Sequence, residues 1–207
     1  MLIKRKNSEI LSLLEIKNER VNVILDTDTY NEIDDQFALI QMLFSEDRIN
    51  VKSINAAPFS MNSRSDNAEK GMELSYDEIF RLLEKINFDR DNFVFKGSKQ
   101  YVGFDKKPIS SAAEDNIIES SLKCSEENPL YVIAIGAISN VASAILKEPE
   151  IIKKIVVVWL GGNALYWPQN SEFNLKQDVG GAQVLFDSGV SLVMIPCKGV
   201  TSHLTST

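Results

Sequence analysis

Short apolar runs alternate along the chain with segments whose apolar residues recur at helical spacing. The apolar runs are typical of buried strands, and they predict strands at residues 21–25, 51–56, 93–95, 130–135, 155–160 and 190–195. The amphipathic segments predict helices at residues 8–19, 33–44, 75–86, 112–122, 140–146 and 180–188. Strands that alternate with helices indicate an α/β fold, an open and mainly parallel sheet with helices on both faces.

The pattern continues without a linker or an internal repeat through all 207 residues, which predicts a single domain. Residues 1–20 are expected to form a helical extension at its N-terminus. Ser139 stands where a side chain would cap the helix at 140–146. The longest segment without clear periodicity is 161–178, and long loops of this kind often carry function.

Composition narrows the class of protein. A formal net charge of −7, with basic residues scattered, argues against a nucleic-acid or anionic-membrane partner. No apolar stretch approaches the ~20 residues that span a bilayer, and the N-terminus lacks a secretory pattern. Cys124 and Cys197 lie far apart and predict free thiols, so a cytoplasmic protein is expected. His203 is the one histidine, which disfavours a histidine-rich metal site or a Ser-His-Asp triad.

Four carboxylates follow the first predicted strand. Asp26 and Asp28 end that strand, and Asp34 and Asp35 open the helix behind it. Ligands of open α/β sheets bind at the carboxyl ends of the strands, so these side chains converge on the binding edge. Like charges this close raise one another's pKa, and a helix N-terminus offsets only ~0.3–1 kcal/mol per charge. The cluster therefore predicts a divalent cation with oxygen ligands, calcium before magnesium.

The sequence around this cluster carries a family resemblance. Residues 23–39, VILDTDTYNEIDDQFAL, resemble the signature of the inosine-uridine preferring nucleoside hydrolases, in which an Asp-x-Asp loop is followed by Asp-Asp. Between the second and third of these aspartates the family has Pro-Gly plus one residue, whereas Thr29 to Ile33 is two residues longer. The chain is thus identified as a divergent member, and the resemblance implies an open, Rossmann-like sheet.

Three later segments resemble the same family in the same order. Residues 136–142, GAISNVA, are similar to its Gly-x-Leu-Thr-Asn-Ile-Ala motif. Residues 160–163, LGGN, resemble its Met-Gly-Gly segment, and residues 172–174, EFN, match its Glu-Phe-Asn motif. Each motif alone is weak, but four in order make a specific signal.

The resemblance implies calcium-dependent hydrolysis of the N-glycosidic bond of ribonucleosides, which gives ribose and a free base. Calcium would be held by Asp28, Asp35 and the backbone carbonyl of Ser139, with Asp26 supporting these ligands from behind. Asp28 would also be the general base that takes a proton from the attacking water. The residues expected to bind the substrate are Asp34, Asn163, Glu172 and Asn174. The implied partners are a nucleoside or ribose, and the family's tendency to oligomerise suggests a homo-oligomer.

Several family features are absent from this sequence, and the late His-Asp pair has no counterpart at all. Family chains are longer, and the aspartate of a late His-Asp pair binds their metal. With two aspartates and one carbonyl, calcium is expected to bind weakly, towards ~10⁻⁴ M. The side of the pocket that would protonate or stack on the leaving base is also missing. General-acid catalysis of this kind accelerates a reaction by ~10²–10⁴-fold. The 207-residue chain is therefore expected to hydrolyse nucleosides poorly or not at all, unless another chain completes its site.

Two alternative functions remain open. Residues 26–29, DTDT, also fit the Asp-x-Asp-x-Thr motif of haloacid-dehalogenase-like phosphatases, with Lys198 as the later lysine, but the acidic pair of that family is absent. A sugar- or nucleoside-binding module without catalysis is the second alternative. Phosphate release would indicate the former, and calcium-dependent ribose binding without hydrolysis the latter.

Overall fold

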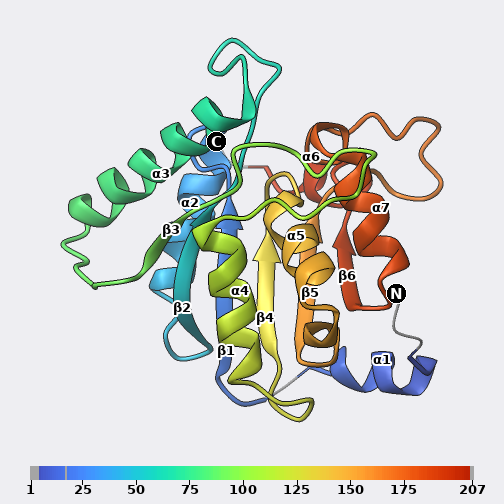
Figure 1. The fold of residues 1–207 in the computed structure, drawn as a ribbon. Coiled ribbons are helices and arrows are strands. Elements are labelled where there is room, and N and C mark those ends of the chain that lie inside the picture. Colours follow the sequence, from blue (N-terminus) through green and yellow to red (C-terminus); the bar gives the residue numbers. More distant parts are fainter. Residues whose placement is uncertain (1–4, 17, 206–207) are drawn as a thin grey trace.

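The structure, a computed structural model, describes residues 5–16 and 18–205. Within these residues one six-stranded sheet runs in the order β3-β2-β1-β4-β5-β6, and all five strand pairs are parallel (Figure 1). The strands are β1 (Val21–Thr27), β2 (Ile49–Ala56), β3 (Val94–Lys96), β4 (Leu130–Ala134), β5 (Ile155–Leu160) and β6 (Ser191–Ile195). The prediction of an open parallel α/β sheet is confirmed.

Helices cover both faces of this sheet. They are α1 (Asn7–Leu13), α2 (Ile33–Leu43), α3 (Ala68–Lys85), α4 (Ala112–Leu122), α5 (Ser139–Lys147), α6 (Phe173–Gln177) and α7 (Val179–Asp187), with short 3-10 turns at Pro149–Lys153 and Thr201–His203. Neighbouring strand residues point to opposite faces, so Ile24 packs into the core under α4, α5 and α7, and Leu25 into the core under α2 and α3. No helix of the described residues is long and apolar enough to span a membrane.

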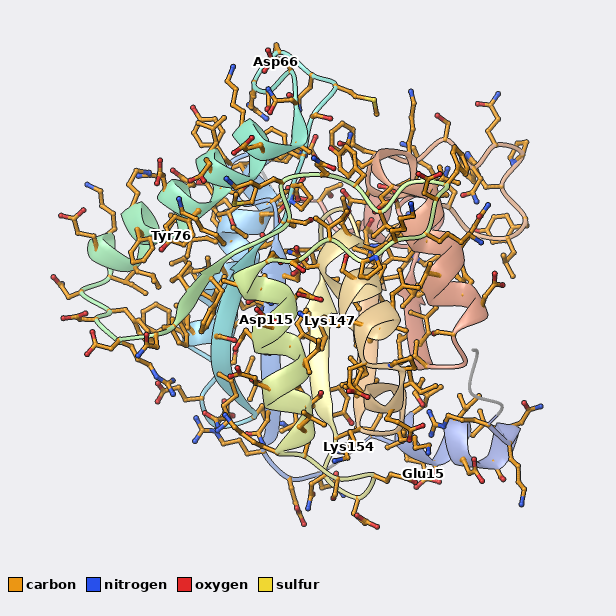
Figure 2. All side chains as sticks on the ribbon, in the orientation of Figure 1. Glu15, Asp66, Tyr76, Asp115, Lys147 and Lys154 are labelled. Atoms are coloured by element: carbon orange, nitrogen blue, oxygen red, sulfur yellow. The ribbon has the colours of Figure 1, made fainter. Side chains whose placement is uncertain are left out.

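Polar contacts tie the helices of one face together. Lys147 at the end of α5 donates to Asp115 on α4 at 2.8 Å and to the buried Glu114 at 3.1 Å, and Figure 2 shows Lys147 and Asp115 pointing toward each other. The capping box of α4 also involves Glu114, whose side chain accepts from the backbone of Ser111. These contacts hold α4 and α5 side by side over β4.

Two helix boundaries and one loop differ from the predictions. The helix predicted at 75–86 begins at Ala68, because the Asn67 side chain caps it and Gly71 lets it approach the backbone of Phe59. The helix predicted at 8–19 ends at Leu13, which is buried, and residue 17 lies outside the described residues. The predicted loop at 161–178 contains α6.

The strand order places a switch point beside β1. From β1 the chain crosses to β2 and β3 on one side, and later to β4, β5 and β6 on the other. In open α/β sheets the crevice at the carboxyl ends of two strands that diverge in this way binds the ligand. The end of β1 and its loop to α2 lie at this crevice, and so do the loops that follow β2 and β4 (Figure 1).

Candidate functional site

Two buried aspartates lie together at the switch point. Asp28 follows β1 and is 1% exposed, while Asp35 in the first turn of α2 is 6% exposed. Burial raises the pKa of Asp28 well above its usual value, and the nearby charge of Asp35 raises it further. Burial also raises the pKa of Asp35 to about 7, which a hydrogen bond from the Thr27 hydroxyl partly offsets. The structure therefore brings Asp28 and Asp35 close enough for their charges to interact, and their role as metal ligands stays a prediction.

The residues at this crevice fit a cation. Oδ2 of Asp28 is buried and has no hydrogen-bond partner among the described residues, a costly state for a carboxylate unless something else satisfies it. Among residues 5–16 and 18–205, no three His, Cys, Asp or Glu side chains are grouped so that they could hold a metal ion. The carboxylates of Asp28 and Asp35 are a pair of oxygen donors, which would suit a hard cation completed by carbonyl and water oxygens.

Asp26 lies behind this pair, inside the sheet. It is fully buried, and its Oδ2 accepts from Nδ2 of Asn140 at 2.9 Å. Burial raises the pKa of Asp26 to about 7, against the lowering effect of the Asn140 hydrogen bond. Asn140 also accepts from the backbone N–H of Ser98 at 2.8 Å, so it joins the ends of β1 and β3 to the start of α5. The supporting role of Asp26 behind the pair stays a prediction.

The side chain of Ser139 does not cap α5, so that prediction was wrong. The N-cap position belongs to Ile138, and the Ser139 hydroxyl donates instead to Asp178 at 2.6 Å. Asp178 is 2% exposed and also accepts from the N–H groups of Val102, Gly103 and Gly181. It therefore connects the start of α5, the loop after β3 and the start of α7.

Asp178 and its neighbour Gln177 were not singled out from the sequence. The Gln177 amide bonds both backbone groups of Ser60, at 2.9 Å and 3.0 Å, and accepts from the Tyr101 hydroxyl. Ser60 and Tyr101 also share a hydrogen bond of 2.8 Å between their hydroxyls. Their position shortly after the Glu-Phe-Asn match was the one sequence signal that could have pointed to them.

The four residues expected to bind the substrate occupy different surroundings. Asp34 is exposed on the first turn of α2. Glu172 caps α6, and its two oxygens accept from the N–H groups of Gly162, Asn174 and Leu175. Asn174 donates from Nδ2 to the carbonyls of Ile135 and Leu160, and so joins the ends of β4 and β5.

Asn163 is buried and braces its own loop. It donates to the carbonyl of Gln169 at 2.9 Å and accepts from the N–H of Lys198 at 3.1 Å. Beyond it, Leu165, Tyr166 and Trp167 are exposed, and the loop between β5 and α6 projects outward from the sheet (Figure 1). Of the four residues, Asp34 alone is exposed, whereas the other three are buried and hold the strand ends and the loop together.

Gly136 provides a first test of this geometry. A Cβ atom at Gly136 would lie 2.8 Å from Oδ1 of Asp28 and 3.1 Å from Cβ of Ala57. The backbone cannot easily withdraw, because the Gly136 carbonyl accepts from the buried Trp159 ring at 3.1 Å. We expect Gly136→Ala to displace Asp28 and, for the calcium site that the sequence predicts, to weaken calcium binding by about tenfold, or ~1.4 kcal/mol.

The measurement is calcium titration by calorimetry, with thermal unfolding in EDTA as the control for a general loss of stability. An unchanged calcium affinity in Gly136→Ala would show that the position of Asp28 does not determine how tightly calcium binds.

Fold and site together define a class, namely an open α/β protein with a buried acidic site at the switch point of its sheet. Within that class the chain belongs to the inosine-uridine preferring nucleoside hydrolase family, whose family model matches residues 23–207. The resemblance drawn from the sequence motifs is confirmed.

The individual relatives share only about a quarter of their residues with this chain. The non-specific ribonucleoside hydrolase RihC of Shigella flexneri is 26% identical over 188 residues, which cover 84% of this chain and 60% of RihC. Among solved structures, the plant nucleoside hydrolase PpNRh1 is similar with a TM-score of 0.65 and 22% identity, over 86% of this chain and 60% of that one. A purine-preferring ribonucleoside hydrolase from Gardnerella vaginalis has a TM-score of 0.63 and 22% identity, over 84% and 60%. The chain thus spans about 60% of the length of the relatives it matches.

Proposed function

We propose that this chain forms the aspartate-bearing part of a calcium-dependent site that hydrolyses the N-glycosidic bond of ribonucleosides. The observation that carries the proposal is the buried pair of Asp28 and Asp35 at the switch point, with one Asp28 oxygen unpartnered among the described residues, in a chain of the nucleoside hydrolase family. Such a pair is unfavourable by itself, and a cation of matching charge would offset its cost.

Asp28, Asp35 and the Ser139 carbonyl would hold the calcium ion in this proposal. Bound there, calcium would lower the pKa of a water molecule and bind the ribose diol. Asp28 would accept a proton from the attacking water as the general base. The water oxygen forms a bond to the anomeric carbon while the bond to the base breaks, and the bonding electrons leave with the base.

The sugar would be held by the residues around this pair. Asp34 is exposed and can accept hydrogen bonds from hydroxyl groups directly. Asn163, Glu172 and Asn174 remain part of the proposal. Because their side chains already bind backbone groups, sugar binding would use their remaining lone pairs or an exchange of partners.

The phosphatase alternative is disfavoured by the surroundings of Asp26. A phosphatase of that kind would use Asp26 as the nucleophile that reaches a phosphoryl group, but Asp26 is fully buried and bonded to Asn140. The family match also favours the hydrolase. A binding module without turnover is consistent with the same site, so it becomes an outcome of the test below.

We also propose a cytoplasmic location and self-association. The free thiols of Cys124 and Cys197 suit a reducing compartment. Self-association follows from the family resemblance alone, and light scattering of the purified chain would test it.

Calcium dependence gives a measurable stability effect. If calcium binds with a dissociation constant of ~10⁻⁴ M, calcium at about 100 times that concentration should stabilise the fold by about 2.7 kcal/mol. Thermal unfolding with calcium, with magnesium and with EDTA measures this directly. A midpoint that calcium does not move would contradict the metal assignment.

The same samples test the reaction. Inosine and uridine hydrolysis is followed by the absorbance of the released base, over hours and at high protein concentration. Calcium-dependent base release supports the hydrolase. Calcium-dependent ribose binding without base release would reduce the protein to a binding module, and phosphate release from a phosphomonoester would restore the phosphatase alternative.

A further inference from the structure

The loop between Asp28 and α2 contains an asparagine that is unusually well buried. Asn31 is 4% exposed, although Tyr30 beside it is 41% exposed and Glu32 on its other side is also exposed. Its backbone N–H donates to the Asp28 carbonyl at 2.7 Å, which closes a tight turn. A buried amide within an exposed loop requires hydrogen-bond partners, and for Asn31 one of them comes from a distant part of the chain.

The partner is Asn62, in the loop between β2 and α3. Nδ2 of Asn62 donates to Oδ1 of Asn31 at 2.7 Å. The other end of the Asn62 amide is fixed as well, because its Oδ1 accepts from the N–H groups of Arg64 and Ser65 at 3.0 Å and 3.1 Å. Figure 2 shows Asp66 on this loop, beyond the carboxyl ends of the strands. Asn62 is thus a rigid donor that reaches across to Asn31.

The fixed Asn31 side chain lies beside Asp28 and contacts it. With its oxygen occupied by Asn62, the Asn31 amide donates through Nδ2 to Asp28, to which its backbone N–H already ties it. A hydrogen bond from the Asn31 side chain lowers the pKa of Asp28, against the larger raising effect of burial. Oδ2 of Asp28 remains without a partner among the described residues, so one carboxylate oxygen stays open to a ligand.

We propose that Asn31 and Asn62 form a positioning pair that holds the Asp28 carboxylate in the orientation that binds the cation. Asn31 lies in the loop from Thr29 to Ile33, the segment in which this chain is two residues longer than the family signature. This inference rests on the proposed calcium site, and it assigns to the two asparagines a role in metal affinity rather than contact with the metal itself.

Calcium affinity of the full chain, measured by calorimetry, tests the pair. Asn31→Ala removes the donor to Asp28 and should weaken calcium binding about tenfold, because a hydrogen bond to a charged group is worth at least that factor. Asn62→Ser keeps an oxygen for the turn at Arg64 and Ser65 but is too short to reach Asn31. It should lower the affinity by a similar factor, and the double variant should be no weaker than Asn31→Ala.

The control is Asn128→Ala, an exposed asparagine in the loop before β4, at the opposite edge of the sheet, which should leave calcium affinity unchanged. Unfolding in EDTA measures the general stability of each variant: the midpoint of Asn31→Ala should fall, because a buried amide is lost, and that of Asn128→Ala should not change. Calcium affinities are therefore compared at a temperature at which every variant is folded. Unchanged calcium affinity in Asn31→Ala, or losses that add in the double variant, would overturn the positioning role alone. A wild-type chain that binds no calcium would overturn the proposed site, and this inference with it.

Discussion

Asp28→Asn is expected to abolish calcium binding and all calcium-dependent turnover, while making the metal-free protein more stable. The substitution keeps the shape of the side chain but removes the charge on which both the metal and the proton transfer depend. General-base catalysis alone contributes ~10²–10⁴-fold. Without metal, the same charge is buried beside Asp35, with one oxygen unpartnered among the described residues, so its removal should add ~1–3 kcal/mol to the free energy of unfolding.

The pH dependence gives this prediction a second readout. Burial, and then the charge of Asp35, raise the pKa of Asp28 above its unfolded value. A carboxyl group whose pKa is higher in the folded state than in the unfolded state contributes its full stability below the unfolded pKa of ~4. That contribution is lost as the pH rises through the folded pKa. The metal-free wild type should therefore lose stability as the pH rises above about 4, and Asp28→Asn should lose less.

Asp47→Asn is the matched control, because Asp47 is exposed in the loop before β2, at the other edge of the sheet. It should change neither calcium affinity nor the metal-free midpoint. Asp28→Asn would count against the site if it bound calcium like the wild type, and equally if it were destabilised in EDTA.

Asp178→Ala is expected to destabilise the fold more than any of the substitutions around Asp28. The Asp178 carboxylate is buried and accepts from three backbone N–H groups and one hydroxyl. A buried donor left unpaired costs about 1–3 kcal/mol, and since such losses are not additive we expect a total of roughly 3–5 kcal/mol. Chemical denaturation monitored by circular dichroism measures this free energy.

Two companion variants sharpen that experiment. Asp187→Ala, an exposed aspartate on the same helix whose ion pair with Lys106 is 4.0 Å long, should change stability by no more than ~0.5 kcal/mol. Asp178→Asn retains an accepting oxygen, so its loss of stability should lie between those of Asp178→Ala and Asp187→Ala. Enough of this variant should fold for a second measurement, namely whether calcium affinity falls when the Ser139 hydroxyl loses the Asp178 carboxylate. A loss below about 1 kcal/mol in Asp178→Ala would show that these donors find water when the carboxylate is removed.

The acidic cluster was predictable because its parts are close in sequence. Asp28 ends an apolar strand and Asp35 opens an amphipathic helix, and the rule that ligands sit at strand ends placed both at the binding edge. The six strands were predictable for a related reason, since strands buried on both faces form continuous apolar runs. Boundaries were less accurate where polar residues begin a helix, as at Ala68.

By itself, then, the sequence determined the parallel sheet, the buried strands and the carboxylates at the end of the first strand, because these follow from local patterns of a few residues. The tertiary structure alone decided which loops meet at the crevice. Asn62 lies 31 residues from Asn31, Asp178 lies 76 from Val102, and Gln177 lies 117 from Ser60. These pairs depend on the strand order β3-β2-β1-β4, which brings distant loops together and which no local pattern of polar and apolar residues encodes.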